Sequence, residues 1–351
     1  MEPASMPSAR EDKDHGTEDI TAKTPHVEDE EVEEQGLEDL NAFRRFWIEN
    51  MSPFFGSLEE TTGPDLGPMR YTDSGPPRCG IPYSAVEIFS LKVTELKAEG
   101  GLRWPLRVFG LVAVRDSRDH RRNILFQRSK DNCQVLTAED SSLVLTGPSR
   151  AIALIDPPEF EVELRAIGAR PSEEKLLCGV CFDISNRSSH KFGQVQTCTE
   201  SGKRCTIELK FSQLGDPLEA TIEVRLFEGS SDFRGRFFAH TEYMGEEDNV
   251  VLLDSTDRRV AVESDGRIIL SRRVVLVEEG AKLVLGVKAW QSGDGKDAVE
   301  YAMEFPARLH SRSNGFLNVG FCEMSVSVAW SVLLLARKLG WCLAAIVTLS
   351  F

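Results

Sequence analysis

The sequence predicts an all-β protein made of antiparallel, sandwich-like sheets. From residue 86 onward apolar and polar residues alternate with a period of two, as in FEVELRAI (160–167), whose apolar residues face one side while Glu and Arg face the other. Strands with one polar face are typical of antiparallel sheets covered on one side. The chain lacks the alternation of strands and helices that would favour a parallel sheet.

Short strands are expected throughout this region, separated by turn signals such as Asp156-Pro-Pro, Gly215-Asp-Pro and Ser264-Asp-Gly. The segments CTIELKF and TIEVRLF alternate as cleanly as FEVELRAI. Further strands are expected at Phe89–Leu96, Leu106–Val114, Ala151–Ile155, Leu176–Ile184, Phe237–Tyr243, Ile268–Val277, Leu283–Trp290 and Cys322–Trp330.

A weak internal sequence similarity favours two lobes, 86–190 and 200–331, within the β-rich domain of residues 86–331. Leu145–Ala166 resembles Leu270–Ala289: each begins with Leu and Thr or Ser, then has an Arg, an apolar strand, an acidic turn and a second strand. Self-similarity is a mark of duplication. One gap is needed, however, and any two β-hairpins share this pattern, so a true repeat and a general likeness both stay open.

The N-terminal part is expected to contribute little to the core. Residues 1–36 are crowded with Asp and Glu and poor in large apolar residues, so burial cannot offset the entropy of ordering and we expect a disordered acidic tail. Residues 37–85 begin with apolar residues near helical spacing, among them Leu40 and Trp47, which predict one short amphipathic helix. Ser52–Pro82 is rich in Gly and Pro and is typical of a strap lying over a surface.

Residues 332–351 form an apolar C-terminal tail. Two adjacent cations interrupt it, and its last uninterrupted run, Leu339–Phe351, is shorter than the roughly 20 residues that span a bilayer. We favour a helix packed on the domain, or an end unrelated to the fold, over a membrane anchor through this tail.

The net charge of −15 argues against a general nucleic-acid binder. The first residues resemble neither a secretory signal nor a transit peptide, which favours the cytoplasm, or else the nucleus. In either compartment the eight cysteines are expected to be reduced thiols.

The densest group of charges lies in VFGLVAVRDSRDHRRNILF (108–126). Asp116, Asp119 and His120 are residue types that bind metals, but neighbouring arginines would repel a cation and pair with the carboxylates, so no metal site is predicted. The preferred interpretation is a solvated loop between two strands. The alternative is a basic patch that binds RNA or another polyanion, formed by Arg115, Arg118, Arg121, Arg122 and Arg128.

Cys178-Gly-Val-Cys181 has the spacing of a zinc or redox motif, but its context favours a structural role. In a strand the two sulfurs point to opposite faces, whereas a zinc site needs both turned toward one ion and a second pair of ligands. We therefore interpret these residues as buried thiols.

No catalytic constellation is recognisable. The histidines are scattered, and the sequence contains no nucleophile elbow, phosphate-binding loop or dinucleotide-binding fingerprint. We therefore predict no catalytic residues, no cofactor and no metal, and the balance of the sequence is against an enzyme.

Several long motifs resemble a known family. PMRYTD (68–73), VEIFSLKVTEL (86–96), WPLRVFGLVAVRD (104–116), LVLTGPSRA (143–151) and CEMSVSVAWS (322–331) are similar to the grass-type plant domain of unknown function found in jasmonate-induced-protein-like sequences. The resemblance covers residues 43–331. It implies a β-rich accessory or interaction domain in plant stress or defence.

Some proteins of that kind are associated with ribosome-inactivating proteins, which remove an adenine from ribosomal RNA with a Glu-x-x-Arg pair on a helix. Glu304 and Arg308 are one residue too far apart for that pair, and Pro306 between them disfavours a helix. No catalytic residue is carried over.

The favoured function is a non-catalytic β-rich interaction domain with an unknown protein partner. The alternative is an RNA- or ribosome-directed protein, either an atypical N-glycosidase or an RNA binder that uses the basic patch.

Overall fold

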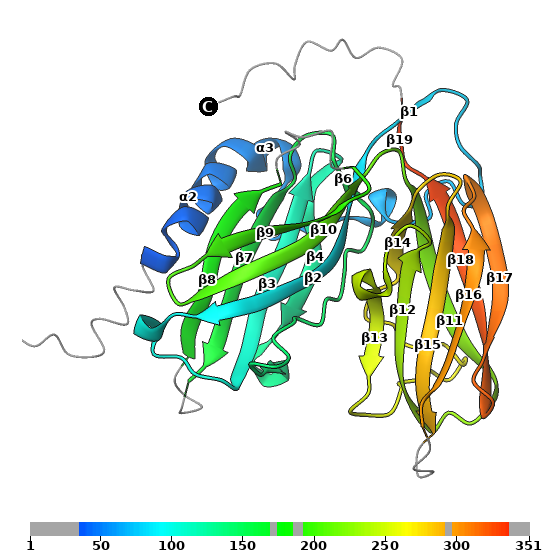
Figure 1. Ribbon diagram of the computed structural model, residues 1–351. Helices are drawn as coiled ribbons and strands as arrows, with labels where there is room; N and C mark the ends of the chain where they lie inside the picture. Colours follow the sequence, from blue (N-terminus) through cyan, green and yellow to red (C-terminus); the bar gives the residue numbers. More distant parts are fainter. Residues whose placement is uncertain (1–34, 169–173, 185–191, 292–296, 337–351) are drawn as a thin grey trace, which may run out of the picture.

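The computed structural model describes residues 35–168, 174–184, 192–291 and 297–336. It confirms the predicted fold class, because the chain is mostly β, its named strands pair antiparallel, and one short helical segment lies near its N-terminal end. Figure 1 shows two β-sandwiches side by side, with helices α2 (Glu38–Phe46) and α3 (Ser52–Phe55) on the outer side of the first.

The first sandwich has one sheet with the order β6-β2-β10-β9 and another with the order β4-β3-β7-β8, to which β5 adds beside β3. Its strands are β2 (Ala85–Leu96), β3 (Leu106–Asp116), β4 (Asp119–Arg128), β5 (Gln134–Leu136), β6 (Ile152–Ala153), β7 (Glu159–Ile167), β8 (Glu174–Asp183), β9 (Val195–Ser201) and β10 (Cys205–Leu214). Short 3₁₀ turns at Ala98–Gly100 and Lys130–Asn132 connect some of them.

The second sandwich has the sheet orders β14-β11-β18-β17 and β13-β12-β15-β16. Its strands are β11 (Leu218–Gly229), β12 (Phe233–Thr241), β13 (Val250–Ser255), β14 (Val274–Val277), β15 (Lys282–Gln291), β16 (Val299–Pro306), β17 (His310–Asn318) and β18 (Cys322–Val332). A 3₁₀ turn at Glu246–Asp248 precedes β13.

The two sandwiches share one topology. When β5 is set aside, the first to eighth strands of each sandwich occupy the same places: β6-β2-β10-β9 corresponds to β14-β11-β18-β17, and β4-β3-β7-β8 to β13-β12-β15-β16. One core-facing pair in each sandwich relates the residue positions of the two: Val86 of β2 pairs with Ile152 of β6, and Ala220 of β11 pairs with Val275 of β14. The two stretches that resemble each other in the sequence fall on β6–β7 and β14–β15, so they occupy matching places in the two sandwiches.

Each sandwich buries its own apolar core, formed by the inward residues of the alternating strands. A third, smaller cluster of buried residues joins the two sandwiches and consists of Tyr83, Ala85, Ala151, Ala153, Leu214, Leu276 and Leu333. Phe89 of β2 packs into the second core, although β2 belongs to the first sandwich. The sandwiches are therefore in direct apolar contact.

The predicted amphipathic helix is present. Leu40 is fully buried and Trp47 is 1% exposed, and a π-helical turn at Trp47–Met51 joins α2 to α3. Trp47 Nε1 donates a hydrogen bond to the Gly56 carbonyl at 3.2 Å, which fixes the end of the segment.

A strap then runs along both sandwiches, through a 3₁₀ turn at Pro64–Leu66 and strand β1 (Gly80–Pro82). Its Thr62 amide bonds to the Arg122 carbonyl in the first sandwich, and its Thr72 hydroxyl bonds to the Trp330 carbonyl in the second. β1 pairs with β19 (Leu334–Ala336), so the described start of the predicted apolar tail joins this strap. Residues 337–351 of that tail and residues 1–34 of the predicted acidic tail lie outside the described residues.

Some strand predictions were wrong in their extent. Only Val274–Val277 of the expected strand Ile268–Val277 is a strand, because the preceding residues make single bridges to β11 and to Val262 instead of a ladder. β13, β16 and β17 were not predicted. β17 carries many exposed polar residues, which weakens the apolar alternation that marks a strand. Among the described residues, no helix is both long and apolar enough to cross a membrane.

Candidate functional site

The prediction of a solvated loop at Asp116–His120 was wrong. β3 and β4 are joined by only Ser117 and Arg118, and Asp116 is 3% exposed. Its carboxylate accepts hydrogen bonds from the backbone N–H groups of Arg118, Asp119 and Ala153 at 2.8–3.1 Å and from both Nη atoms of Arg150 at 2.7 and 3.0 Å. All these donors point at a carboxylate that water barely reaches, so Asp116 is a structural tie between β3, β4 and β6.

The predicted arginine patch is not one surface. Arg115 and Arg122 both pair with the buried Glu161 of β7, with nearest distances of 3.6 and 2.6 Å, and Arg44 of α2 joins them at 3.0 Å. The Arg115 guanidinium lies 4.1 Å from the centre of the Trp47 ring. Burial lowers the pKa of Arg115 to about 10, despite the opposing effect of Glu161. This network attaches the helical segment to the sheet.

The other three arginines of the predicted patch lie in separate places. Arg121 pairs with Glu60 of the strap at 3.1 Å. Arg118 faces the strap beside Tyr71, and Arg128 lines a separate open hollow of about 630 Å³ beside Phe109. Successive side chains of a strand point to opposite faces, so arginines that are close in the sequence do not form one basic surface here.

The other candidate residues from the sequence take part in core packing or in ion pairs. Among the described residues, no group of His, Cys, Asp and Glu could hold a metal ion. Cys178 lies in the first core, where a hydrogen bond with Cys205 and burial raise the pKa of its thiol, while Cys181 is half-buried among carboxylates. Glu304 lies on strand β16, not on a helix, and pairs with Lys282 at 2.7 Å.

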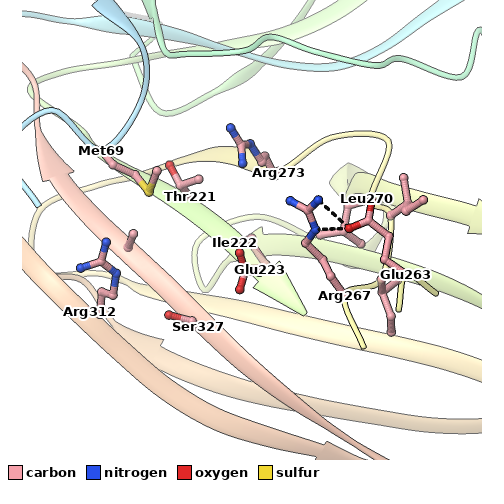
Figure 2. Close-up of a pocket in the computed structure, with 13 residues that line it drawn as sticks. Met69, Thr221, Ile222, Glu223, Glu263, Arg267, Leu270, Arg273, Arg312 and Ser327 are labelled. Atoms are coloured by element: carbon pink, nitrogen blue, oxygen red, sulfur yellow. Dashed lines mark hydrogen bonds and ion pairs between the residues drawn. The ribbon is translucent and has the colours of Figure 1, made fainter. Parts of the chain in front are cut away.

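A groove that the sequence did not predict lies on the outer face of the sheet β14-β11-β18-β17 (Figure 2), and we call it the β18 groove. Its volume is about 410 Å³. Small side chains, Ser327 and Ala329 of β18, form its floor, because the residues that alternate with them, such as Val328, point into the core. The walls come from Thr221 and Glu223 of β11, from Arg312 of β17, and from the segment 263–270.

Most charged side chains of the β18 groove are fixed in ion pairs. Arg267 binds Glu263, and Arg225 beside the groove binds Glu223 at 2.7 Å. Arg312 pairs with Asp73 of the strap. Figure 2 shows the Arg267–Glu263 pair, with Arg273 standing apart at the rim.

Arg273 differs from these arginines. It is exposed, and it makes no ion pair with any residue that the structure describes. Its backbone is held, since its carbonyl accepts the Ile222 N–H at 2.8 Å. The backbone of Arg273 is therefore fixed at the rim, and its guanidinium charge is open to a ligand.

The sheet face that carries the β18 groove has a distinct set of contacts toward each end. At one end, Glu219 accepts hydrogen bonds from the backbone N–H groups of Met69 in the strap and of Ala151 before β6, at 3.0 and 2.8 Å, which fixes the strap and the first sandwich at this end of the groove. Burial raises the pKa of Glu219. Further along the same face, Phe227 and Phe316 are 64% and 48% exposed and stack edge to face at 5.4 Å.

This arrangement suits binding. The groove combines a floor of small side chains, oriented ions and one open guanidinium, with an aromatic pair further along the same face. The signal that could have located it is SVSVAWS (325–331), where small residues alternate with apolar ones on a strand.

A family model described as "Domain of unknown function (DUF6598)" matches residues 85–328, which span both sandwiches. Among curated proteins, none matches this chain. Among solved structures, human GIVD cytosolic phospholipase A2 is similar with 11% identity and a TM-score of 0.27, over 72% of this chain and 31% of that chain. A calcium-bound pair of C2 domains from Extended-Synaptotagmin 2 is similar with 9% identity and a TM-score of 0.23, over 74% and 100%. This chain thus spans about a third of the phospholipase, and likeness at these scores carries no argument about function.

Proposed function

We propose that this chain, which belongs to the family described as a domain of unknown function (DUF6598), is a non-catalytic binding module that holds an extended segment of a partner protein in the β18 groove. The observation that carries the proposal is the groove itself, a volume of about 410 Å³ on an open sheet face whose charged walls are already oriented by ion pairs.

The shape of the groove favours an extended segment. Ser327 and Ala329 leave room for a backbone to approach the sheet closely, while the flanking strands rise on either side with longer side chains. A row of small positions between taller walls accommodates a chain that lies along β18, with alternate side chains reaching each wall. Because the wall ions are held in place before binding, little side-chain entropy is lost on association.

The RNA- or ribosome-directed alternative has less support. Two of the five arginines on which it rests, Arg115 and Arg122, are occupied by Glu161 beneath the helical segment. The proposed setting in plant stress or defence, and in the cytoplasm or nucleus, rests on the resemblance to jasmonate-induced-protein-like sequences and on the composition of the chain.

The proposal is tested by selecting short linear peptides from a phage-displayed library on the full chain. The selected peptides are then measured against Ser327→Trp, which fills the floor of the groove, and against Lys288→Trp, a matched control on an exposed position of β15 in the other sheet. We expect binding to be lost with the first variant and kept with the second, while both variants retain the wild-type melting temperature. Peptides that bind a folded Ser327→Trp variant as well as the wild type would contradict the proposal.

A further inference from the structure

The floor of the β18 groove has a counterpart in the first sandwich. In the shared register, Thr221 pairs with Ala329 across β11 and β18, and the corresponding pair across β2 and β10 is Glu87 with Ser212. All four residues point away from the cores of their sandwiches. The groove is therefore the same face of the fold, repeated in the second lobe.

In the first sandwich this face is a protein-docking surface, because the second sandwich sits on it. Glu87 accepts a hydrogen bond from the Leu276 N–H at 2.6 Å and pairs with Arg272 at 3.1 Å. Leu214 and Leu276 meet in the apolar cluster that joins the two sandwiches. The occupant of the face is thus an extended stretch of polypeptide, the entry to strand β14, anchored by one ion pair.

Arg273 has a counterpart as well. Ile152 and Val275 hold matching places, so the residue two positions earlier is Arg150 in the first sandwich and Arg273 in the second. Arg150 is buried and paired with Asp116 through both of its Nη atoms. Arg273 keeps the cation and makes no ion pair with a described residue, although its charge acts on the buried Glu219 and opposes the rise of that carboxyl's pKa. The matching position in the fold thus has a directly bonded carboxylate in one lobe and no ion pair with a described residue in the other.

A second copy of this chain does not offer a suitable occupant. The corresponding segment of its first sandwich, at β6, is already used within its own chain, where the Ala151 N–H bonds to Glu219 and the Ala153 N–H bonds to Asp116. The β14 edge of its second sandwich already donates the Leu276 N–H to Glu87 of the same chain. The occupant is therefore a different protein.

We propose that the β18 groove binds an extended, strand-like segment of a different protein that carries an acidic side chain, and that this carboxylate pairs with Arg273. The inference rests on the proposed function and adds the chemistry of the partner. Arginine presents two parallel N–H groups to a carboxylate, so the contact selects Asp or Glu at one position of the bound segment.

The test is a charge exchange with the same peptide library. Peptides selected on the wild-type chain are expected to share an Asp or Glu at one position. Arg273→Glu is expected to weaken them about tenfold or more and, when used for selection, to favour Lys or Arg at that position. Arg236→Glu, on the exposed face of β12, is the matched control and is expected to bind the wild-type peptides unchanged.

Each outcome decides a different claim. Selected peptides that are lost with Ser327→Trp but carry no shared acidic position, or that bind Arg273→Glu unchanged, would overturn this inference and leave the proposed function standing. Peptides that bind the folded Ser327→Trp variant normally would overturn both. A wild-type dimer in sedimentation that dissociates with Arg273→Glu would assign the groove to a second copy and also overturn the inference.

Discussion

Asp116→Asn tests whether the charged hairpin between β3 and β4 is structural. The substitution keeps the size of the side chain and removes its charge. Arg150, which is 3% exposed, then loses the countercharge that both of its Nη atoms contact. The new amide also brings N–H groups toward backbone donors, among them the N–H of Ala153.

The magnitude follows from burial. Removing one partner of a buried ion pair costs about 3–5 kcal/mol, because the remaining charge stays in a medium that solvates it poorly. We expect Asp116→Asn to lower the free energy of unfolding by this amount, a large part of the roughly 5–15 kcal/mol that is typical of a folded domain. Glu60→Gln is the matched control. Its partner Arg121 and Glu60 itself are 40% and 46% exposed, so we expect a change below about 1 kcal/mol.

The assay is urea-induced unfolding followed by circular dichroism and tryptophan fluorescence, with the slope of the transition compared between variants. A double variant, Asp116→Leu with Arg150→Met, is expected to be less destabilised than the sum of its single changes, by about 1 kcal/mol or more. If Asp116→Asn and Glu60→Gln cost the same small amount, the carboxylate is not a structural tie and its charge is free for another role.

Three further predictions concern other parts of the molecule. Burial alone would raise the pKa of Glu161, but hydrogen bonds and charges from Arg122 and Arg44 lower it below 4.5. Its stabilisation is therefore present above that pH and lost as the pH falls further, so amide exchange in α2 should rise there, and Glu161→Gln should show fast exchange at every pH. In the native protein, iodoacetamide should modify the exposed Cys79 and spare Cys178 until the chain unfolds, as peptide mass spectrometry would show. Purified ribosomes incubated with the chain should release no adenine, since the proposed function is non-catalytic.

The fold class was predictable because apolar alternation survives wherever one face of a strand is buried. FEVELRAI and TIEVRLF both form the strands that their patterns predict, β7 and β11. β16 was not predicted although VEYAMEFP also alternates, and its Val299 and Tyr301 are both 40% exposed, so the apolar face of this strand is only partly buried. The similarity between Leu145–Ala166 and Leu270–Ala289 was weak as a sequence match, yet both stretches lie in matching strands, which connect the two sheets of their sandwiches.

The charged hairpin shows why a site is harder to predict than a fold. Local sequence marks Arg115 and Asp116 as polar, and polar residues in a turn usually meet water. Their partners, Glu161 and Arg150, are distant in sequence, so only the tertiary structure reveals the ion pairs that permit burial. The β18 groove was missed for the opposite reason: its floor consists of small residues, and Arg273 looks like any other surface arginine until its counterpart Arg150 is identified.

The measurement that tests the binding claim most directly is hydrogen–deuterium exchange of the full chain with and without a selected acidic peptide at saturation. The account predicts slower exchange in the segment 263–273 and in β17, which line the β18 groove, and no change in the sheet β4-β3-β7-β8. Protection of the β3–β4 hairpin, or no protection at either wall while the peptide is bound, would contradict it.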